Sequence, residues 1–289
     1  MEPPFPEFDP VSAKGKKTGK KAGKKSNDTA TISTPLRLRE VPFRMLVPNL
    51  ITLGAICSGL SSIRFAIEDR FELAIVAIVF AALLDGLDGR VARFLKSATA
   101  FGEQMDSLAD FVNFGVAPAL VLYLCFLKEL NSFGWIVALV FALCACLRLA
   151  RFNVTLDDPD KPKWHSNFFV GVPAPAGALL GLLPIYLSLL GYDKTPWLAV
   201  VSSIYVLGVA FLLVSNLPTW SGKQLGKRVS RRYVLPLMMG IILAVVFLFS
   251  YPWTFLAAIS LAYLATLPLS YRDWHQRNAA DQSAATQED

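Results

Sequence analysis

Four aspartates and two arginines lie within one 26-residue stretch, from Asp85 to Asp110, that reads DGLDGRVARFLKSATAFGEQMDSLAD. Apolar segments of helix length flank this stretch on both sides. A charge at the centre of a bilayer costs roughly 2.5–3.5 kcal/mol. Because four uncompensated aspartates would be so costly, their presence indicates a use, and the use that fits best is holding metal ions.

The spacing of the four carboxylates suits two facing helices. Asp85 and Asp88 are three residues apart, and Asp106 and Asp110 are four apart, so each pair lines one face of a helix. Residues 94–102 are long enough to turn the chain, which allows the two acidic faces to meet. Four oxygen donors without a soft ligand select hard cations, Mg²⁺ or Mn²⁺.

Three uses of these groups remain open from spacing alone. Two divalent cations together with Arg93 suit phosphoryl transfer, with one carboxylate left to take a proton from the nucleophile. Intramembrane aspartates also line the pathways of cation transporters, and some acidic residues only pair with arginines. A transporter would repeat polar groups on distant spans, whereas the apolar segments between residues 172 and 270 contain almost none.

The elements that position these residues are apolar helices. Of the 289 residues, 54% are hydrophobic, which is too many for an ordinary soluble domain. Crossing the membrane takes about 20 apolar residues in a helix, since lipid offers backbone groups no partner. The sequence predicts an all-α, polytopic transmembrane bundle of about eight spans, the last two of which could merge. The spans are expected at residues 46–66, 71–92, 104–127, 133–151, 172–190, 196–215, 233–250 and 252–270.

Basic residues predict the orientation of this bundle. Of the 28 Lys and Arg residues, 24 fall in segments that the eight spans place on one side. The positive-inside rule therefore puts both termini and the loop of the aspartate stretch in the cytoplasm. The net charge of +6 comes largely from these flanks and requires no nucleic-acid partner. We expect residues 1–35 to be a disordered basic cytoplasmic tail, 36–47 an interfacial segment, 48–190 the catalytic core, 191–271 additional helices and 272–289 a cytoplasmic tail.

The aspartate stretch resembles the signature of a known family. Its pattern, Asp85-x₂-Asp88-Gly89-x₂-Ala92-Arg93-x₈-Gly102-x₃-Asp106-x₃-Asp110, is similar at every fixed position to the motif of the CDP-alcohol phosphatidyltransferases. In that family a CDP-linked donor loses CMP while its phosphoryl-bearing part passes to an alcohol. The resemblance implies two divalent cations, Mg²⁺ or Mn²⁺, held by Asp85, Asp88, Asp106 and Asp110, with Asp110 also the catalytic base.

The same resemblance implies a set of donor-binding residues. Gly89, Ala92 and Gly102 would allow close approach of the nucleotide, Arg93 would contact its phosphate region, and Asp88 would touch the cytidine. Pro48-Asn49-x₂-Thr52 resembles the pattern that starts the first core helix of the family. A polar pair at a helix start could equally be capping. The candidate donor-binding residues are therefore Asn49, Thr52, Asp88, Gly89, Ala92, Arg93 and Gly102.

Further segments resemble the integral-membrane phosphatidylserine synthases within this family: residues 101–110, 114–118, 148–153 and 169–175. The implied reaction joins CDP-diacylglycerol and L-serine, giving phosphatidylserine and CMP. Arg148 and Arg151 are candidates for binding the serine carboxylate, with Asn153 a weaker one. The two arginines could equally serve only to fix topology.

Other acceptors and the setting of the enzyme rest on the same resemblance. Choline, inositol or glycerol phosphate are alternative acceptors for the same chemistry. The resemblance also implies a homodimer among membrane lipids, in a bacterial plasma membrane, with the active site facing the cytoplasm. The family core has six helices, so the additional ones are expected to contact lipid or a second copy.

Overall fold

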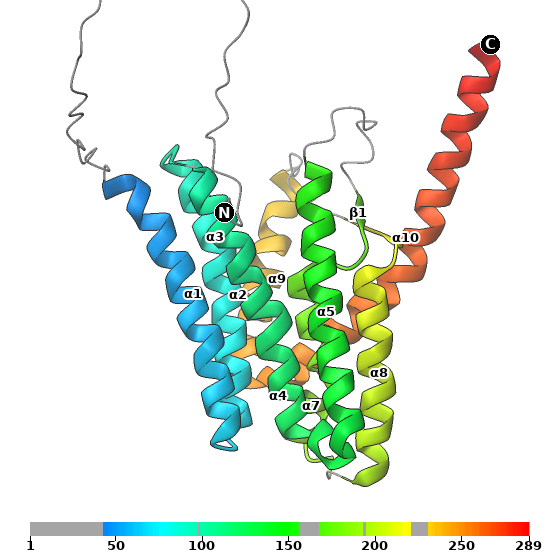
Figure 1. Cartoon of the computed structure of the whole chain (residues 1–289). Coiled ribbons are helices and arrows are strands. Elements are labelled where there is room, and N and C mark those ends of the chain that lie inside the picture. Colours follow the sequence, from blue (N-terminus) through cyan, green and yellow to red (C-terminus); the bar gives the residue numbers. More distant parts are fainter. Residues whose placement is uncertain (1–42, 98, 157–167, 193–194, 221–230, 289) are drawn as a thin grey trace, which may run out of the picture. The chain divides into compact units, whose positions relative to one another are not determined.

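The computed structural model describes residues 43–97, 99–156, 168–192, 195–220 and 231–288 (Figure 1). These residues are almost wholly helical, which confirms the all-α prediction. The predicted tail, residues 1–35, and most of the predicted interfacial segment lie outside the described residues. The first described helix begins at Phe43, so residues 43–47 of that segment belong to it.

The described residues form ten α-helices, one π-helical segment, one 3₁₀ turn and two short strands. The helical elements are α1 (Phe43–Ile67), α2 (Phe71–Phe94), α3 (Ala100–Asp110), a π-helical segment (Phe111–Val116), α4 (Ala117–Cys125), a 3₁₀ turn (Leu127–Leu130), α5 (Asn131–Leu156), α6 (Ala174–Gly181), α7 (Leu183–Leu189), α8 (Pro196–Val214), α9 (Arg231–Ser250) and α10 (Pro252–Glu288). Two short strands, β1 (Phe168–Val170) and β2 (Pro218–Trp220), pair antiparallel, with Phe169 opposite Thr219.

Local sequence signals account for where several helices start. Proline occupies the first turn of α4, α6, α7 and α8, where its fixed φ fits and its missing N–H costs nothing. Thr99 caps α3, because its side chain accepts a hydrogen bond from the Gly102 N–H at 3.0 Å. This cap starts the helix of the second acidic pair four residues before the expected span at residue 104.

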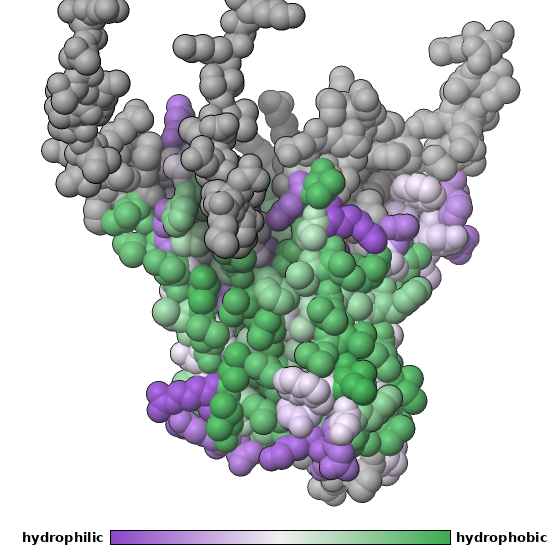
Figure 2. All heavy atoms as spheres, in the orientation of Figure 1, coloured by the Kyte–Doolittle hydropathy of each residue, from purple (hydrophilic) through white to green (hydrophobic). Residues whose placement is uncertain are grey.

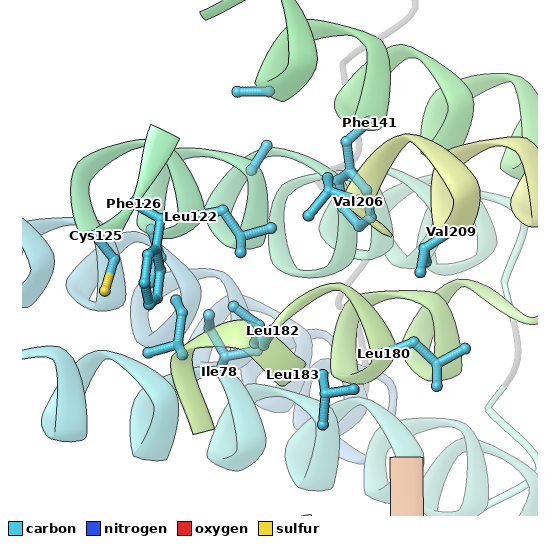
Figure 3. Packing of buried hydrophobic residues seen from close by; sticks show 14 of the residues in the cluster. Ile78, Leu122, Cys125, Phe126, Phe141, Leu180, Leu182, Leu183, Val206 and Val209 are labelled. Atoms are coloured by element: carbon cyan, nitrogen blue, oxygen red, sulfur yellow. The ribbon is translucent and has the colours of Figure 1, made fainter. Parts of the chain in front are cut away.

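The helices pack around a common apolar core. Helix α1 makes its main contact with α2, and α5 makes its main contact with α8. Side chains of α2, α4, α5 and α8 and of the α6–α7 junction meet in the centre (Figure 3), among them Ile78, Leu122, Phe141, Leu182 and Val206. All five are at most 1% exposed. This core fixes the helices that carry the polar residues described below.

Several helices are suited to crossing a membrane. Among the described residues, five are long and apolar enough: Leu46–Ile67, Ala100–Cys125, Leu127–Val154, Trp197–Val214 and Pro252–Gln276. Two shorter apolar stretches are Ala174–Leu189 and Val234–Ser250. Figure 2 shows apolar side chains in a band between hydrophilic groups at both ends. The chain is therefore an integral membrane helical bundle, and the count of eight spans stays a prediction.

Two helix ends differ from the expected spans. Helices α9 and α10 are separate, with a break at Tyr251, so the last two spans do not merge. Helix α10 continues to Glu288 instead of ending near residue 270. In Figure 1 the α2–α3 connection, the end of α5, β1 and the last part of α10 lie at the same end of the bundle.

Candidate active site

The first acidic pair lies on α2 where this helix packs against α1. Asp88 is buried, and its Oδ2 accepts a 2.7 Å hydrogen bond from the Thr52 hydroxyl on α1. Its Oδ1 accepts from the Gly89 N–H at 2.6 Å. Asp85 lies one turn earlier and is half-buried, and its Oδ1 is buried without a hydrogen-bond partner among the described residues.

The second acidic pair lies on α3, and α3 brings it to the first. Asp106 and Asp110 are both half-buried. The carboxyl groups of Asp85 and Asp110 lie within hydrogen-bonding reach of each other. Asp88 and Asp106 are close enough to act on both of them electrostatically. Four carboxyl groups from two consecutive helices therefore gather at one place, as their spacing predicts.

The four carboxyl groups are chemically suited to bind a hard divalent cation. All the donors are carboxylate oxygens, the ligands that Mg²⁺ and Mn²⁺ prefer, and the unpartnered Oδ1 of Asp85 is available to bind one. As the described side chains are placed, however, no group of three or more His, Cys, Asp or Glu is arranged to hold a metal ion. Carboxylates that repel one another separate unless positive charge or a proton lies between them. Binding would accordingly require the side chains to move together.

A cavity of about 190 Å³ opens beside the acidic residues, between α1, α2 and α3. All seven predicted donor-binding residues line it, and so does Asp106, whereas Asp85 and Asp110 do not. Four lining residues, Pro48, Ser97, Thr99 and Glu103, were not predicted as site residues. The complete lining is Pro48, Asn49, Thr52, Asp88, Gly89, Ala92, Arg93, Ser97, Thr99, Gly102, Glu103 and Asp106.

The two cavity glycines have different surroundings. A Cβ added at Gly89 would meet no atom within 4 Å, so the backbone of Gly89 borders open space. A Cβ at Gly102 would lie 3.1 Å from both Asn49 Oδ1 and Thr99 Oγ1. Gly102 therefore lets α1 and α3 approach each other, while Gly89 leaves room for a ligand to reach the backbone of α2.

Arg93 supplies positive charge at the cavity. Its side chain is exposed, and its Nε donates to the Gly89 carbonyl at 3.0 Å. This bond folds the side chain back along α2 towards the acidic residues. An arginine fork beside a cavity suits a phosphate group.

The three acceptor candidates on α5 have different partners. Arg148 is buried, donates from Nε to the Val172 carbonyl at 2.9 Å, and lies near Asp110. Asn153 donates from Nδ2 to Ser107 Oγ at 3.0 Å, which ties α5 to α3 beside Asp106. Both candidates therefore adjoin the acidic helix.

Arg151 instead turns towards the end of α8. It is exposed, and its Nη1 donates to the Val214 carbonyl at 2.7 Å and to Asn216 Oδ1 at 2.8 Å. Arg148 and Arg151, both candidates for binding the acceptor, thus hydrogen-bond to different parts of the chain. The two Cα atoms share a helix face, but the long side chains diverge to different neighbours.

Of the unpredicted lining residues, Thr99 had a usable signal. A threonine directly before a helical segment is a common N-cap, and a capping residue lies at the helix end where α3 meets the cavity. Ser97 is buried in the connection between α2 and α3. Connections carry no periodicity, so no pattern in the sequence marked it.

Comparison with known proteins gives a consistent result. The CDP-alcohol phosphatidyltransferase family matches residues 45–214, and the family described as CDP-alcohol phosphatidyltransferase 2 matches residues 232–268. A relative from Mycobacterium leprae named CDP-diacylglycerol–serine O-phosphatidyltransferase is 42% identical over 241 residues, covering 82% of this chain and 78% of the relative.

Relatives with the same name and lower identity occur in other bacteria. The protein from Helicobacter pylori strain 26695 is 38% identical over 60% of this chain and 70% of its own length. The protein from Bacillus subtilis is 30% identical over 59% of this chain and 88% of its own length. These names describe an enzyme, which favours phosphoryl transfer over cation transport. The chain belongs to the CDP-alcohol phosphatidyltransferase family.

Proposed function

We propose that this protein transfers the phosphatidyl group of CDP-diacylglycerol to L-serine, giving phosphatidylserine and CMP, with the help of divalent cations. The observation that carries the proposal is the cavity whose wall holds Asp88, Asp106 and Arg93. In this cavity, carboxylates, a guanidinium and the open backbone of Gly89 lie together at the edge of an apolar bundle. A nucleotide linked to a lipid can bind at such a place. The names of the relatives supply the acceptor.

The residues of the cavity bind the donor. Arg93 pairs with the donor phosphates, and the open backbone at Gly89 admits them close to α2. Thr52 keeps the Asp88 carboxylate in place through its 2.7 Å hydrogen bond. Asp85, Asp88, Asp106 and Asp110 would hold one or two cations, Mg²⁺ or Mn²⁺. Such cations, when bound, neutralise charge on the diphosphate and on the leaving CMP.

Asp110 acts on the acceptor. It takes the proton of the serine hydroxyl as the serine oxygen forms a bond to the phosphorus that carries diacylglycerol. The bond from this phosphorus to the CMP oxygen breaks, and CMP leaves with the electron pair. Arg148, which lies near Asp110, holds the serine carboxylate and so keeps the hydroxyl beside its base.

The proposal includes a setting for the enzyme. The distribution of Lys and Arg supports eight spans, with both termini and the active site on the cytoplasmic side of a bacterial plasma membrane. The exposed apolar surface of α9 supports a homodimer or contact with lipid.

An acceptor assay tests the proposal. Purified protein with CDP-diacylglycerol, Mg²⁺ or Mn²⁺ and labelled L-serine should form a labelled lipid and equal amounts of CMP. EDTA should stop the reaction, and excess Mg²⁺ or Mn²⁺ should restore it. Choline, inositol and glycerol 3-phosphate serve as parallel acceptors. Turnover with one of these but not with serine would overturn the acceptor and keep the chemistry, and full activity in EDTA would overturn the role of cations.

A further inference from the structure

The cavity between α1, α2 and α3 has two ends. At its acidic end Thr52 donates to Asp88 at 2.7 Å, and Asp106 also lines the wall. At its outer end α1 and α3 meet, where a Cβ at Gly102 would lie 3.1 Å from Asn49 Oδ1. Helices α1 and α3 begin at the same end of the bundle (Figure 1). On both helices the two ends of the cavity are one turn apart, about 4.5–6 Å along the helix axis.

Glu103 places a carboxylate at the outer end. It follows Gly102 in the sequence, is exposed and lines the cavity. Its N–H donates to the Thr99 carbonyl at 3.0 Å, which fixes its backbone in the first turn of α3. Among the described residues no ion pair involves Glu103. Its carboxylate oxygens are therefore available to accept hydrogen bonds from a ligand in the cavity.

The charges along the cavity indicate which part of a ligand each end receives. Arg93 Nε donates to the Gly89 carbonyl at 3.0 Å, which folds the guanidinium back along α2 towards Asp88. A diphosphate fits the acidic end, where this guanidinium and bound cations would neutralise it. Glu103 would repel a phosphate, and its lining neighbours Asn49 and Thr99 are neutral. The outer end therefore suits an uncharged part of the ligand that has hydrogen-bond donors.

In a CDP-linked donor this uncharged part is the nucleoside. The ribose is bonded directly to the diphosphate, and the base lies beyond the ribose. Because Glu103 is only one helical turn from Asp106, the sugar is the first group to come within its reach. The 2′- and 3′-hydroxyls are adjacent donors, and the two oxygens of one carboxylate can accept from both. A carboxylate binds ribose hydroxyls in this way in dinucleotide-binding folds.

We infer that Glu103 accepts hydrogen bonds from the ribose hydroxyls of the donor nucleotide, and that it thereby makes the protein prefer ribonucleotides to 2′-deoxyribonucleotides. The inference rests on the proposed function, because it takes the donor to be linked to CDP. It assigns the sugar to α3, whereas Arg93 and Gly89 of α2 face the phosphates. Glu103 is thus a specificity-determining residue that takes no part in the bond changes at phosphorus.

Binding of CMP and 2′-deoxy-CMP tests this role. Each nucleotide is titrated with Mg²⁺ into the purified protein in detergent, and calorimetry gives the Kd. The wild-type protein should bind CMP roughly tenfold more tightly, because 2′-deoxy-CMP lacks a hydrogen bond to a charged group. In Glu103→Ala the two Kd values should become nearly equal. Glu72→Ala is the matched control: it removes an exposed glutamate from the first turn of α2, away from the cavity lining, and should keep the tenfold ratio.

UMP separates the sugar from the base. Contact of Glu103 with the cytosine amine would make Glu103→Ala lose the preference for CMP over UMP and keep the preference for ribose, which would overturn the inference. Equal binding of CMP and 2′-deoxy-CMP by the wild-type protein would overturn it as well, even if that protein makes phosphatidylserine. Binding of CMP requires no acceptor. A ribose preference that depends on Glu103, in a protein that forms no lipid from serine, would therefore support the inference and overturn the proposed acceptor.

Discussion

Helices α2 and α9 are both largely apolar, with 24 and 20 residues, yet they differ in what surrounds them. Helix α2 packs along α1 and carries Asp85 and Asp88 on the side where α3 adds two more aspartates. Helix α9 contacts mainly α10. Its large side chains are open, including Leu243, which is 70% exposed, and Phe249, which is 82% exposed.

The difference shows how a membrane helix can hold charge. Both aspartates of α2 have polar neighbours: Thr52 donates a hydrogen bond to Asp88, and Asp85 lies close enough to Asp110 for the two carboxyl groups to share a proton. Helix α9 has no Asp or Glu between Arg231 and Ser250, so it has no acidic side chain for a polar neighbour to stabilise. Apolar side chains can face lipid at no cost in free energy. Close packing between helices is therefore needed around the aspartates, whereas α9 can do without it.

The strongest test of this difference between α2 and α9 is to replace one of the four aspartates. Asp110→Asn should lower turnover by about 10²–10⁴-fold, because the amide cannot take a proton from the acceptor. Binding of CDP-diacylglycerol should largely persist, since Asp110 does not line the donor cavity. CMP release measures the first effect, and binding of labelled donor measures the second.

Asp69, just before the start of α2 and far along that helix from Asp85 and Asp88, offers a control for Asp110→Asn. Asp69 is exposed in the turn between α1 and α2, with φ +58°, a conformation that asparagine also tolerates. Asp69→Asn should therefore leave both activity and folding unchanged. An Asp110→Asn enzyme that turned over like the Asp69→Asn control would show that Asp110 is not the base.

A smaller effect on activity is expected when one methyl group is added at the cavity wall. Gly89→Ala should raise KM for the donor roughly tenfold, because the added Cβ enters the open space that the diphosphate needs. Gly86→Ala, one turn earlier on α2, also meets no atom within 4 Å but does not line the cavity. Both changes replace glycine in a helix and should raise thermal stability slightly. Equal donor KM values in the two variants would exclude Gly89 from the donor site.

Much of the fold follows from the runs of apolar residues. Helix α2 was expected over residues 71–92 and spans Phe71–Phe94, and α8 was expected over 196–215 and spans Pro196–Val214. The far end of α10 could not be found in this way. Residues after 270 are polar, and hydropathy does not distinguish a helix that leaves the membrane from an irregular tail.

The site could be predicted where its residues are close in sequence. The acidic pairs and the cavity residues from Gly89 to Gly102 have helical spacing, and spacing within and between neighbouring helices predicts which residues meet. The divergence of Arg148 and Arg151 could not be predicted, because long side chains choose among neighbours that only the tertiary structure provides.

The smallest effect should come from α9, and it completes the comparison. Leu243→Ala should change neither activity nor thermal stability measurably, since an exposed side chain exchanges one apolar contact for another when lipid or detergent replaces it. Ile78→Ala on α2 removes a fully buried side chain and should cost about 2–5 kcal/mol. Melting in a fixed detergent, followed with both variants, measures the contrast. A loss of stability in Leu243→Ala as large as that in Ile78→Ala would mean that α9 packs against another protein surface. A second copy of the chain would be the first candidate for that surface, because α9 has few packing contacts within its own chain.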